Sequence, residues 1–173
     1  AMGADTQDVL VTSDGGNSLI TLAGKGVRPV YGDDSGGSLD LGIVDSAGPV
    51  GEAFIELTNL AKDGLGDALT GLTILSAVIT GPDAALFSTP DFIPEILSEG
   101  DTLLVKVRLD GAGALDGIKN ALLTFTTDQG QTLGVSGETF DVSLTGEVVP
   151  EPTTLIMLAF GVPALLKAKR RFR

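Results

Sequence analysis

Short segments in which apolar and polar residues alternate dominate residues 1–150 of this chain, with glycine, aspartate and proline between them. In Val105-Lys106-Val107-Arg108-Leu109 every second side chain is apolar, which is the pattern of a half-buried strand. Several short strands with regular turn signals are typical of an immunoglobulin-like β-sandwich, so we predict an all-β body. The six predicted strands are Ser38–Val44, Gly51–Thr58, Leu69–Thr80, Thr102–Leu109, Asn120–Thr127 and Phe140–Val148.

Composition narrows the chemistry that is open to this body. The chain has no cysteine, histidine or tryptophan, which removes disulfides, thiol or imidazole catalysis and the commonest zinc ligands. A nucleophile would have to be a serine or threonine with a lysine base, and the few lysines of the body lie on predicted strands or turns. We therefore expect no catalytic residue, no cofactor and no enzyme activity.

Charge divides the chain into an acidic body and a basic tail. Residues 1–152 hold all 23 Asp and Glu but only six Lys and Arg, a balance of −17, and the last 21 residues carry five Lys and Arg with no acid. Binding to phosphate backbones needs clusters of Lys and Arg, so the acidic body disfavours nucleic acid as a partner.

The uncharged segment from Thr153 to Leu166 is followed at once by Lys167. As a helix its 14 residues would cover about 21 Å of a hydrocarbon core about 30 Å thick, which interfacial flanking residues and a snorkelling lysine could extend. We predict a single C-terminal transmembrane α-helix. The span is assigned to Thr153, Leu155, Ile156, Leu158, Phe160, Pro163 and Leu166.

Basic residues that flank a span stay on the cytoplasmic side, so this helix predicts a single-pass protein of a bacterial membrane. Its C-terminus would be cytoplasmic and its sandwich periplasmic or extracellular, next to the lipid bilayer. Export would need a signal peptide, and residues 1–10 have neither a basic start nor an apolar stretch, so we expect a chain trimmed at its N-terminus.

The C-terminal residues resemble the bacterial PEP-CTERM sorting signal. The resemblance lies in Val149, Pro150, Glu151 and Pro152, an apolar helix with a central Gly161, and the cluster Arg170 and Arg171. It implies recognition by an exosortase, a membrane transpeptidase-like enzyme of bacteria that typically make exopolysaccharide. An ordinary tail anchor with a chance Pro-Glu-Pro is the alternative.

The N-terminal residues 1–26 echo the end of the body. Val9-Leu10-Val11-Thr12 and the later Leu19-Ile20-Thr21-Leu22-Ala23-Gly24 parallel Leu122–Thr127 and Val142–Gly146, and both pairs predict a hairpin that ends in a Leu-x-Gly strand. Either residues 1–26 are the end of an upstream sandwich repeat, or this hairpin packs onto the one complete domain.

Residues 27–149 resemble the choice-of-anchor D domains, an immunoglobulin-like group related to the ASPM/SPD-2/hydin modules. The most distinctive segment is Gly81-Pro82-Asp83-Ala84-Ala85-Leu86-Phe87. Such domains commonly precede surface-anchoring signals, so the resemblance implies a domain followed by an anchor. We assign residues 27–149 to this domain and residues 150–173 to the motif, the helix and the basic cytoplasmic tail.

Calcium is the one metal for which the sequence offers candidate ligands. Asp33, Asp34, Asp63 and Asp67 are hard oxygen ligands in Gly-rich loops, but no calcium-loop spacing is complete. Aspartate is also favoured in turns for backbone reasons, so we interpret these residues as turn acids and expect no metal.

These features favour a non-catalytic structural or interaction protein. The leading version is an accessory subunit whose helix packs on integral-membrane proteins while its sandwich covers the outer face of the complex. The alternative is an exosortase-sorted protein of the cell surface or exopolysaccharide. A polysaccharide-binding module ranks lower because sugar stacking needs exposed aromatic rings, the chain offers only Tyr31 and seven Phe, and Phe125 and Phe140 are expected to face the core.

Overall fold

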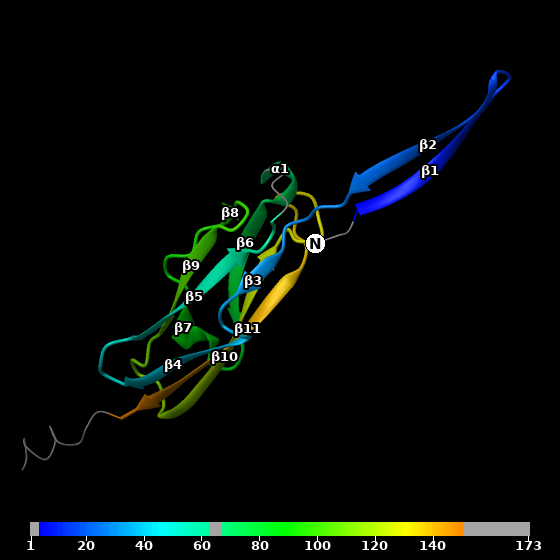
Figure 1. Ribbon diagram of the computed structural model, residues 1–173. Helices are drawn as coiled ribbons and strands as arrows, with labels where there is room; N and C mark the ends of the chain where they lie inside the picture. The colour runs from blue at the N-terminus through cyan, green and yellow to red at the C-terminus, as the bar shows by residue number, and fades with distance from the viewer. Residues whose placement is uncertain (1–3, 63–66, 151–173) are drawn as a thin grey trace, which may run out of the picture.

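The computed structural model describes residues 4–62 and 67–150, which form a β-sandwich with a projecting hairpin (Figure 1). The hairpin consists of β1 (Ala4–Ser13) and β2 (Gly16–Lys25). The sandwich contains β3 (Tyr31–Asp33), β4 (Ser38–Asp45), β5 (Gly51–Asn59), α1 (Asp67–Thr70), β6 (Leu72–Thr80), the 3₁₀ turn η1 (Ala84–Leu86), β7 (Phe87–Ser88), β8 (Glu95–Leu97), β9 (Thr102–Leu109), β10 (Gly117–Thr127) and β11 (Thr139–Val149).

Two sheets form the sandwich. One has the strand order β4-β11-β10-β6-β8 and the other the order β3-β5-β9-β7. The neighbouring strands are antiparallel except β4 and β11, which run parallel. This arrangement places β10 and β11 in the interior of the larger sheet, where each is paired on both edges.

The core lies between the two sheets and consists of aliphatic side chains with few aromatic rings. On β9 the side chains of Val105, Val107 and Leu109 are buried, as the alternating pattern predicts. Lys106 and Arg108 between them point to the outer face. Fully buried large side chains from both sheets are Ile55, Leu57, Leu72, Ile74, Leu97, Leu109, Leu123, Phe125 and Leu144.

A glycine in β11 allows the two sheets to approach closely. A Cβ atom on Gly146 would lie 2.4 Å from Cδ2 of Leu109, which is closer than two carbon atoms can pack. The parallel pairing with β4 shifts register at the same place, between Thr145 and Glu147. The Leu-x-Gly pattern of β11 therefore reflects packing against the opposite sheet.

The six strands predicted from the alternation are confirmed, with small shifts at their ends. The largest shift is at the start of β6, where residues 67–70 form α1 and the strand begins at Leu72. The sequence interpretation missed β3, β7 and β8, which have only two or three residues and lie at sheet edges. Such short strands show no period that a sequence pattern could reveal.

The prediction of an all-β sandwich is confirmed for the described residues, but the prediction of a transmembrane helix after it is wrong. Over residues 4–62 and 67–150 no helix is long and apolar enough to cross a membrane, and α1 has four residues. The predicted 14-residue run was already short of the roughly 20 residues that a span needs. The residues assigned to it, from Thr153 to Leu166, lie outside the described ranges. The predicted single-pass membrane location depended on that helix and is therefore wrong as well.

Candidate interaction surface

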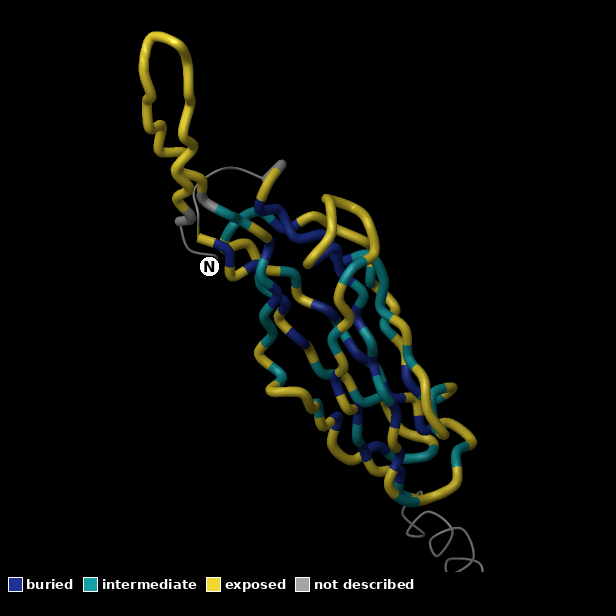
Figure 2. The backbone as a smooth tube through the Cα atoms, turned by 90° about the vertical axis from the view of Figure 1, so that its right-hand side faces the viewer, coloured by how far each residue is buried: buried dark blue, intermediate teal, exposed yellow. Residues whose placement is uncertain are grey.

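The hairpin β1–β2 is a sheet of its own that extends away from one end of the sandwich (Figures 1 and 2). Its ten-residue strands pair without a bulge from Ala4↔Lys25 to Ser13↔Gly16, and Asp14 and Gly15 form the turn. The side chains of residues 6–24 are all exposed, as the uniform yellow of the hairpin in Figure 2 shows. No described residue of the sandwich covers either face of the hairpin.

One face of the hairpin carries most of its large apolar side chains. Val9 lies opposite Ile20, Gln7 lies opposite Leu22, and Val11 follows Val9 on the same side. Val9 is 40% exposed and Leu22 is 55% exposed. We call the set Gln7, Val9, Val11, Ile20 and Leu22 the apolar face.

The opposite face of the hairpin is more polar. It contains one apolar pair, Leu10 opposite Leu19, and next to it Thr21 Oγ1 donates a hydrogen bond of 2.7 Å to Asp8 Oδ1. Both outer edges of the hairpin are also free, because in the described structure β1 and β2 pair only with each other. The hairpin thus offers one apolar face and two unpaired strand edges.

The chain that leaves the hairpin is fixed to the sandwich by buried polar groups. The N–H of Leu60 donates a hydrogen bond to the carbonyl oxygen of Val30 (2.7 Å), and the N–H of Tyr31 donates one to Oε1 of Gln129 (2.6 Å). The Asn59 side chain is fully buried, and its Nδ2 donates to the carbonyl oxygens of Thr70 (2.7 Å) and Leu97 (3.0 Å). These bonds hold the base from which the hairpin extends.

Tyr31 is the largest side chain at this base. Its ring stacks on Phe140 at a centroid distance of 3.9 Å. Its hydroxyl is buried and makes no hydrogen bond of ordinary geometry among the described residues, although the Asp33 carboxylate lies close enough to act on it. Burial raises the pKa of the Tyr31 hydroxyl well above its usual range, and the charge of Asp33 acts in the same direction.

The predicted sorting motif enters the described structure only at its first two residues. Val149 ends β11 and pairs with Asp45 of β4, and Pro150 follows it in an exposed position. They lie at the end of the sandwich opposite the hairpin (Figure 1). The other predicted motif residues, Glu151, Pro152, Gly161, Arg170 and Arg171, lie outside the described ranges.

Of the aspartates weighed as calcium ligands, the two that the structure describes in full each accept a backbone N–H. Asp33 Oδ1 accepts the N–H of Ser35 (2.9 Å), and Asp34 Oδ1 accepts the N–H of Glu56 (2.9 Å). The Asp33 carboxylate therefore stabilises a turn, whereas the Asp34 carboxylate joins this turn to β5. Asp63 lies outside the described residues, and the side chain of Asp67 is not described. The described residues contain no group of three or more metal-ligating side chains that could hold an ion.

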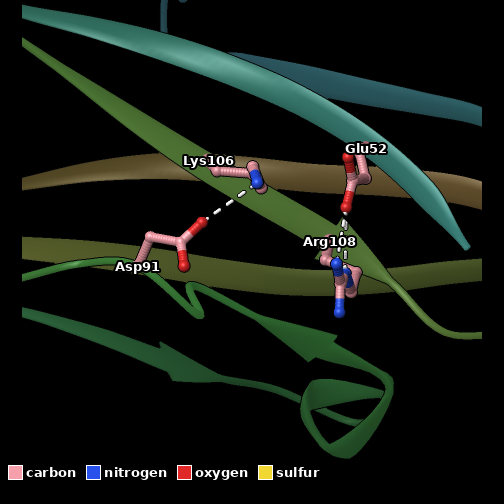
Figure 3. Close-up of polar contacts among 4 residues, drawn as sticks. All are labelled: Glu52, Asp91, Lys106 and Arg108. Carbon is pink, nitrogen blue, oxygen red and sulfur yellow. Dashed lines mark hydrogen bonds and ion pairs between the residues drawn. The ribbon is translucent and has the colours of Figure 1, made fainter.

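The outer face of the β3-β5-β9-β7 sheet carries two ion pairs (Figure 3). Arg108 Nη2 lies 2.7 Å from Glu52 Oε1, and Lys106 Nζ lies 3.0 Å from Asp91 Oδ2. These side chains are at least a quarter exposed, so each pair contributes at most about 1 kcal/mol. This face resembles an ordinary solvated sheet surface.

The described aromatic side chains are mostly inside the sandwich. Phe125 is fully buried and Phe140 stacks against buried Tyr31, as expected for core residues. Phe54, at 47%, is the one exposed aromatic residue in the described ranges. A single exposed ring offers little for sugar stacking.

No protein-family model and no curated protein matches this sequence. Among solved structures, a Porphyromonas gingivalis W83 protein of unknown function is similar over 85% of this chain and 66% of its own, just under two thirds, at 15% identity and a TM-score of 0.48. PapD-like domain 7 (ASH / PapD-like) of human CEP192 is similar over 70% of this chain and 87% of its own, at 13% identity and a TM-score of 0.49. The VesB protease of Vibrio cholerae is similar over 69% of this chain and 31% of its own, at 16% identity and a TM-score of 0.38.

The strand order and the shared core define the class of the protein. Two packed sheets, antiparallel except for one parallel edge, make the body an immunoglobulin-like β-sandwich. The projecting hairpin is the feature that sequence interpretation described least completely. Its strands were expected, but alternation alone could not show that both faces lack a partner.

Proposed function

We propose that this protein is a non-catalytic interaction protein that contacts other proteins through its projecting hairpin. The observation that supports this role is the exposure of six large apolar side chains on a sheet that packs on no other element of the described structure. They are Val9, Leu10, Val11, Leu19, Ile20 and Leu22.

The low stability of an isolated, exposed hairpin is the reason to expect a partner at this surface. An isolated two-stranded hairpin is only marginally stable in water, and free strand edges invite pairing with another chain. Partner strands commonly add to such edges, with backbone hydrogen bonds supplying affinity and alternate side chains supplying specificity. The sandwich itself needs no such help, because its core is closed by strands of its own.

The proposal leaves out the membrane-bound accessory subunit and the exosortase-sorted surface protein, since both versions depended on the C-terminal helix. The resemblances to PEP-CTERM proteins and choice-of-anchor D domains stay predictions. An immunoglobulin-like body is compatible with the second of these resemblances.

Site-specific photo-cross-linking tests the proposal. A benzophenone amino acid at Ile20 should give discrete adducts with protein partners in the cells that make this chain. The same group at Leu104, 60% exposed on the sandwich, should give few. Adding Val9→Asp, on the same face as Ile20, should remove the Ile20 adducts. Equal labelling from both positions, or labelling that Val9→Asp leaves unchanged, would argue against the hairpin as the contact surface.

A further inference from the structure

The hairpin β1–β2 and the buried hairpin β10–β11 have the same register. Val9 pairs with Ile20 as Leu123 pairs with Val142, and Gln7 pairs with Leu22 as Ala121 pairs with Leu144. The residues at the end of each first strand follow the same alignment, because Val11-Thr12-Ser13-Asp14 corresponds to Phe125-Thr126-Thr127-Asp128. The connections differ, since Asp14 and Gly15 join β1 to β2 whereas residues 128–138 join β10 to β11. The apolar face therefore corresponds, residue by residue, to the face that β10 and β11 turn into the core.

The two hairpins differ in how far their matching side chains are buried. Leu123, Phe125, Val142 and Leu144 are fully buried. Their counterparts Val9, Val11, Ile20 and Leu22 are 40–55% exposed. Two positions depart from this match. Gln7 stands where Ala121 lies at the edge of the core, and Ser18 stands where Phe140 packs against the core.

Gly24 supports the same correspondence between the two hairpins. It occupies the place of Gly146, where a side chain would collide with Leu109. Around Gly24 a Cβ atom would meet nothing within 4 Å. Glycine weakens a strand interior and often marks a close approach of another segment. In the hairpin that close approach is missing.

The turn supplies a third correspondence. Asp128, fully buried after β10, accepts the N–H of Thr73 at the start of β6 (2.9 Å). Asp14 holds the same position in the turn of the hairpin. It could cap the strand next to β1 in the same way.

The surface area that two hairpins could bury is too small for a second copy of the same hairpin to be the partner. Two ten-residue strands make a face of roughly 300 Å², so two such faces would bury roughly 600 Å² in all. Stable interfaces bury about 1,200–2,000 Å². A sandwich core would cover the face and pair both edges, as β4 and β6 do for β11 and β10.

We infer that β1–β2 is the closing hairpin of a second immunoglobulin-like unit. Its partner is an open sandwich of strands like β3 to β9, with a β4-like strand beside β2 and a β6-like strand beside β1. This inference rests on the proposed function, since it names the class of partner that the hairpin binds.

A fusion protein tests it. A second copy of residues 27–116, which spans β3 to β9, is joined directly ahead of Gly3, because Gly3 stands where Gly117 begins β10. Amide exchange is then measured for β1 and β2. A control fusion carries residues 27–149 in the same place, so that the added unit has its own closing hairpin and leaves β1–β2 open.

In the first fusion the amides of β1 and β2 should exchange at least about tenfold more slowly than in the parent chain, because opening would require unfolding of the added unit. In the control fusion they should exchange as in the parent. Val9→Asp should restore fast exchange in the first fusion, and Leu10→Asp, on the opposite face, should not.

Exchange at the parent rate in the first fusion would overturn the inference, including when the added strands stay unfolded while the control unit folds. Equal effects of Val9→Asp and Leu10→Asp would overturn it as well. If cross-links form from Ile20 while the fusion leaves the hairpin exposed, the proposed function stands and this inference alone fails.

Discussion

Asn59 shows how a buried polar residue can organise one end of the sandwich. Its amide donates to two carbonyl oxygens, and its Oδ1 accepts the N–H of Ala61 (3.1 Å). The side chain joins the end of β5 to α1 and β8, where the backbone leaves the regular sheets. No periodicity marks such a residue, because its partners come from segments far apart in the chain.

Tyr31 leads to a prediction at the residue scale. Its buried hydroxyl makes no hydrogen bond of ordinary geometry within the described structure, and an unsatisfied buried polar group costs about 1–3 kcal/mol. Tyr31→Phe should therefore leave the free energy of unfolding unchanged or raise it, whereas Tyr31→Ala should lower it by about 3–5 kcal/mol. Urea unfolding followed by circular dichroism measures both, and a loss above about 1 kcal/mol in Tyr31→Phe would contradict the assignment.

The raised pKa of Tyr31 adds a pH dependence. Since folding favours the neutral phenol, its contribution to stability is present below the unfolded pKa of about 10 and is lost as pH rises toward the folded pKa. Stability should fall more steeply above about pH 10 in the parent chain than in Tyr31→Phe. The chain has a single tyrosine, so tyrosinate absorbance reports this group directly.

At the scale of elements, the two hairpins of equal register allow a paired prediction. Val9→Ala should change the unfolding free energy of the sandwich by less than about 0.5 kcal/mol, because Val9 is exposed and touches no part of the core. Leu123→Ala, at the matching position in β10, should cost about 2–5 kcal/mol.

Denaturant unfolding of the two variants beside the parent chain tests this pair. Val142→Ala serves as a second core variant on the neighbouring strand. A loss in Val9→Ala as large as that in Leu123→Ala would mean that the hairpin packs on the sandwich in solution.

The whole molecule is an elongated sandwich with its hairpin at one end and Pro150 at the other (Figure 1). Its net charge is −12, which acts against compaction through repulsion between like charges. Raising the ionic strength from about 0.01 M to 0.15 M shortens the screening length from about 30 Å to 8 Å. Thermal stability should therefore rise over this range.

A variant separates this global effect from the local ion pairs. Glu52→Gln breaks the ion pair with Arg108 but also reduces the net negative charge of the protein. The decrease in unfolding free energy should therefore stay below about 1 kcal/mol and should become smaller as salt is added. Melting curves at several salt concentrations measure both effects. A fall in melting temperature with added salt would show that attractive pairs outweigh the net repulsion.

Much of the body could be predicted from local pattern. Strands such as β5, β9 and β10 alternate along their length, so period two revealed both their positions and their buried faces. The composition by itself likewise excluded thiol, imidazole and disulfide chemistry. The apolar C-terminal run shows the limit of such patterns, because its 14 residues fall short of the roughly 20 that a membrane span needs.

Tertiary structure alone decided what the hairpins do. The sequence determined that residues 1–26 and the end of the body share a hairpin pattern, since both obey the same alternation and carry an aspartate directly after the first strand. Whether such a face is core or surface depends on the strands that pair with its edges and on the sheet opposite it. The β10–β11 hairpin has β4, β6 and the β3-β5-β9-β7 sheet around it, whereas the β1–β2 hairpin has no neighbours within the described structure.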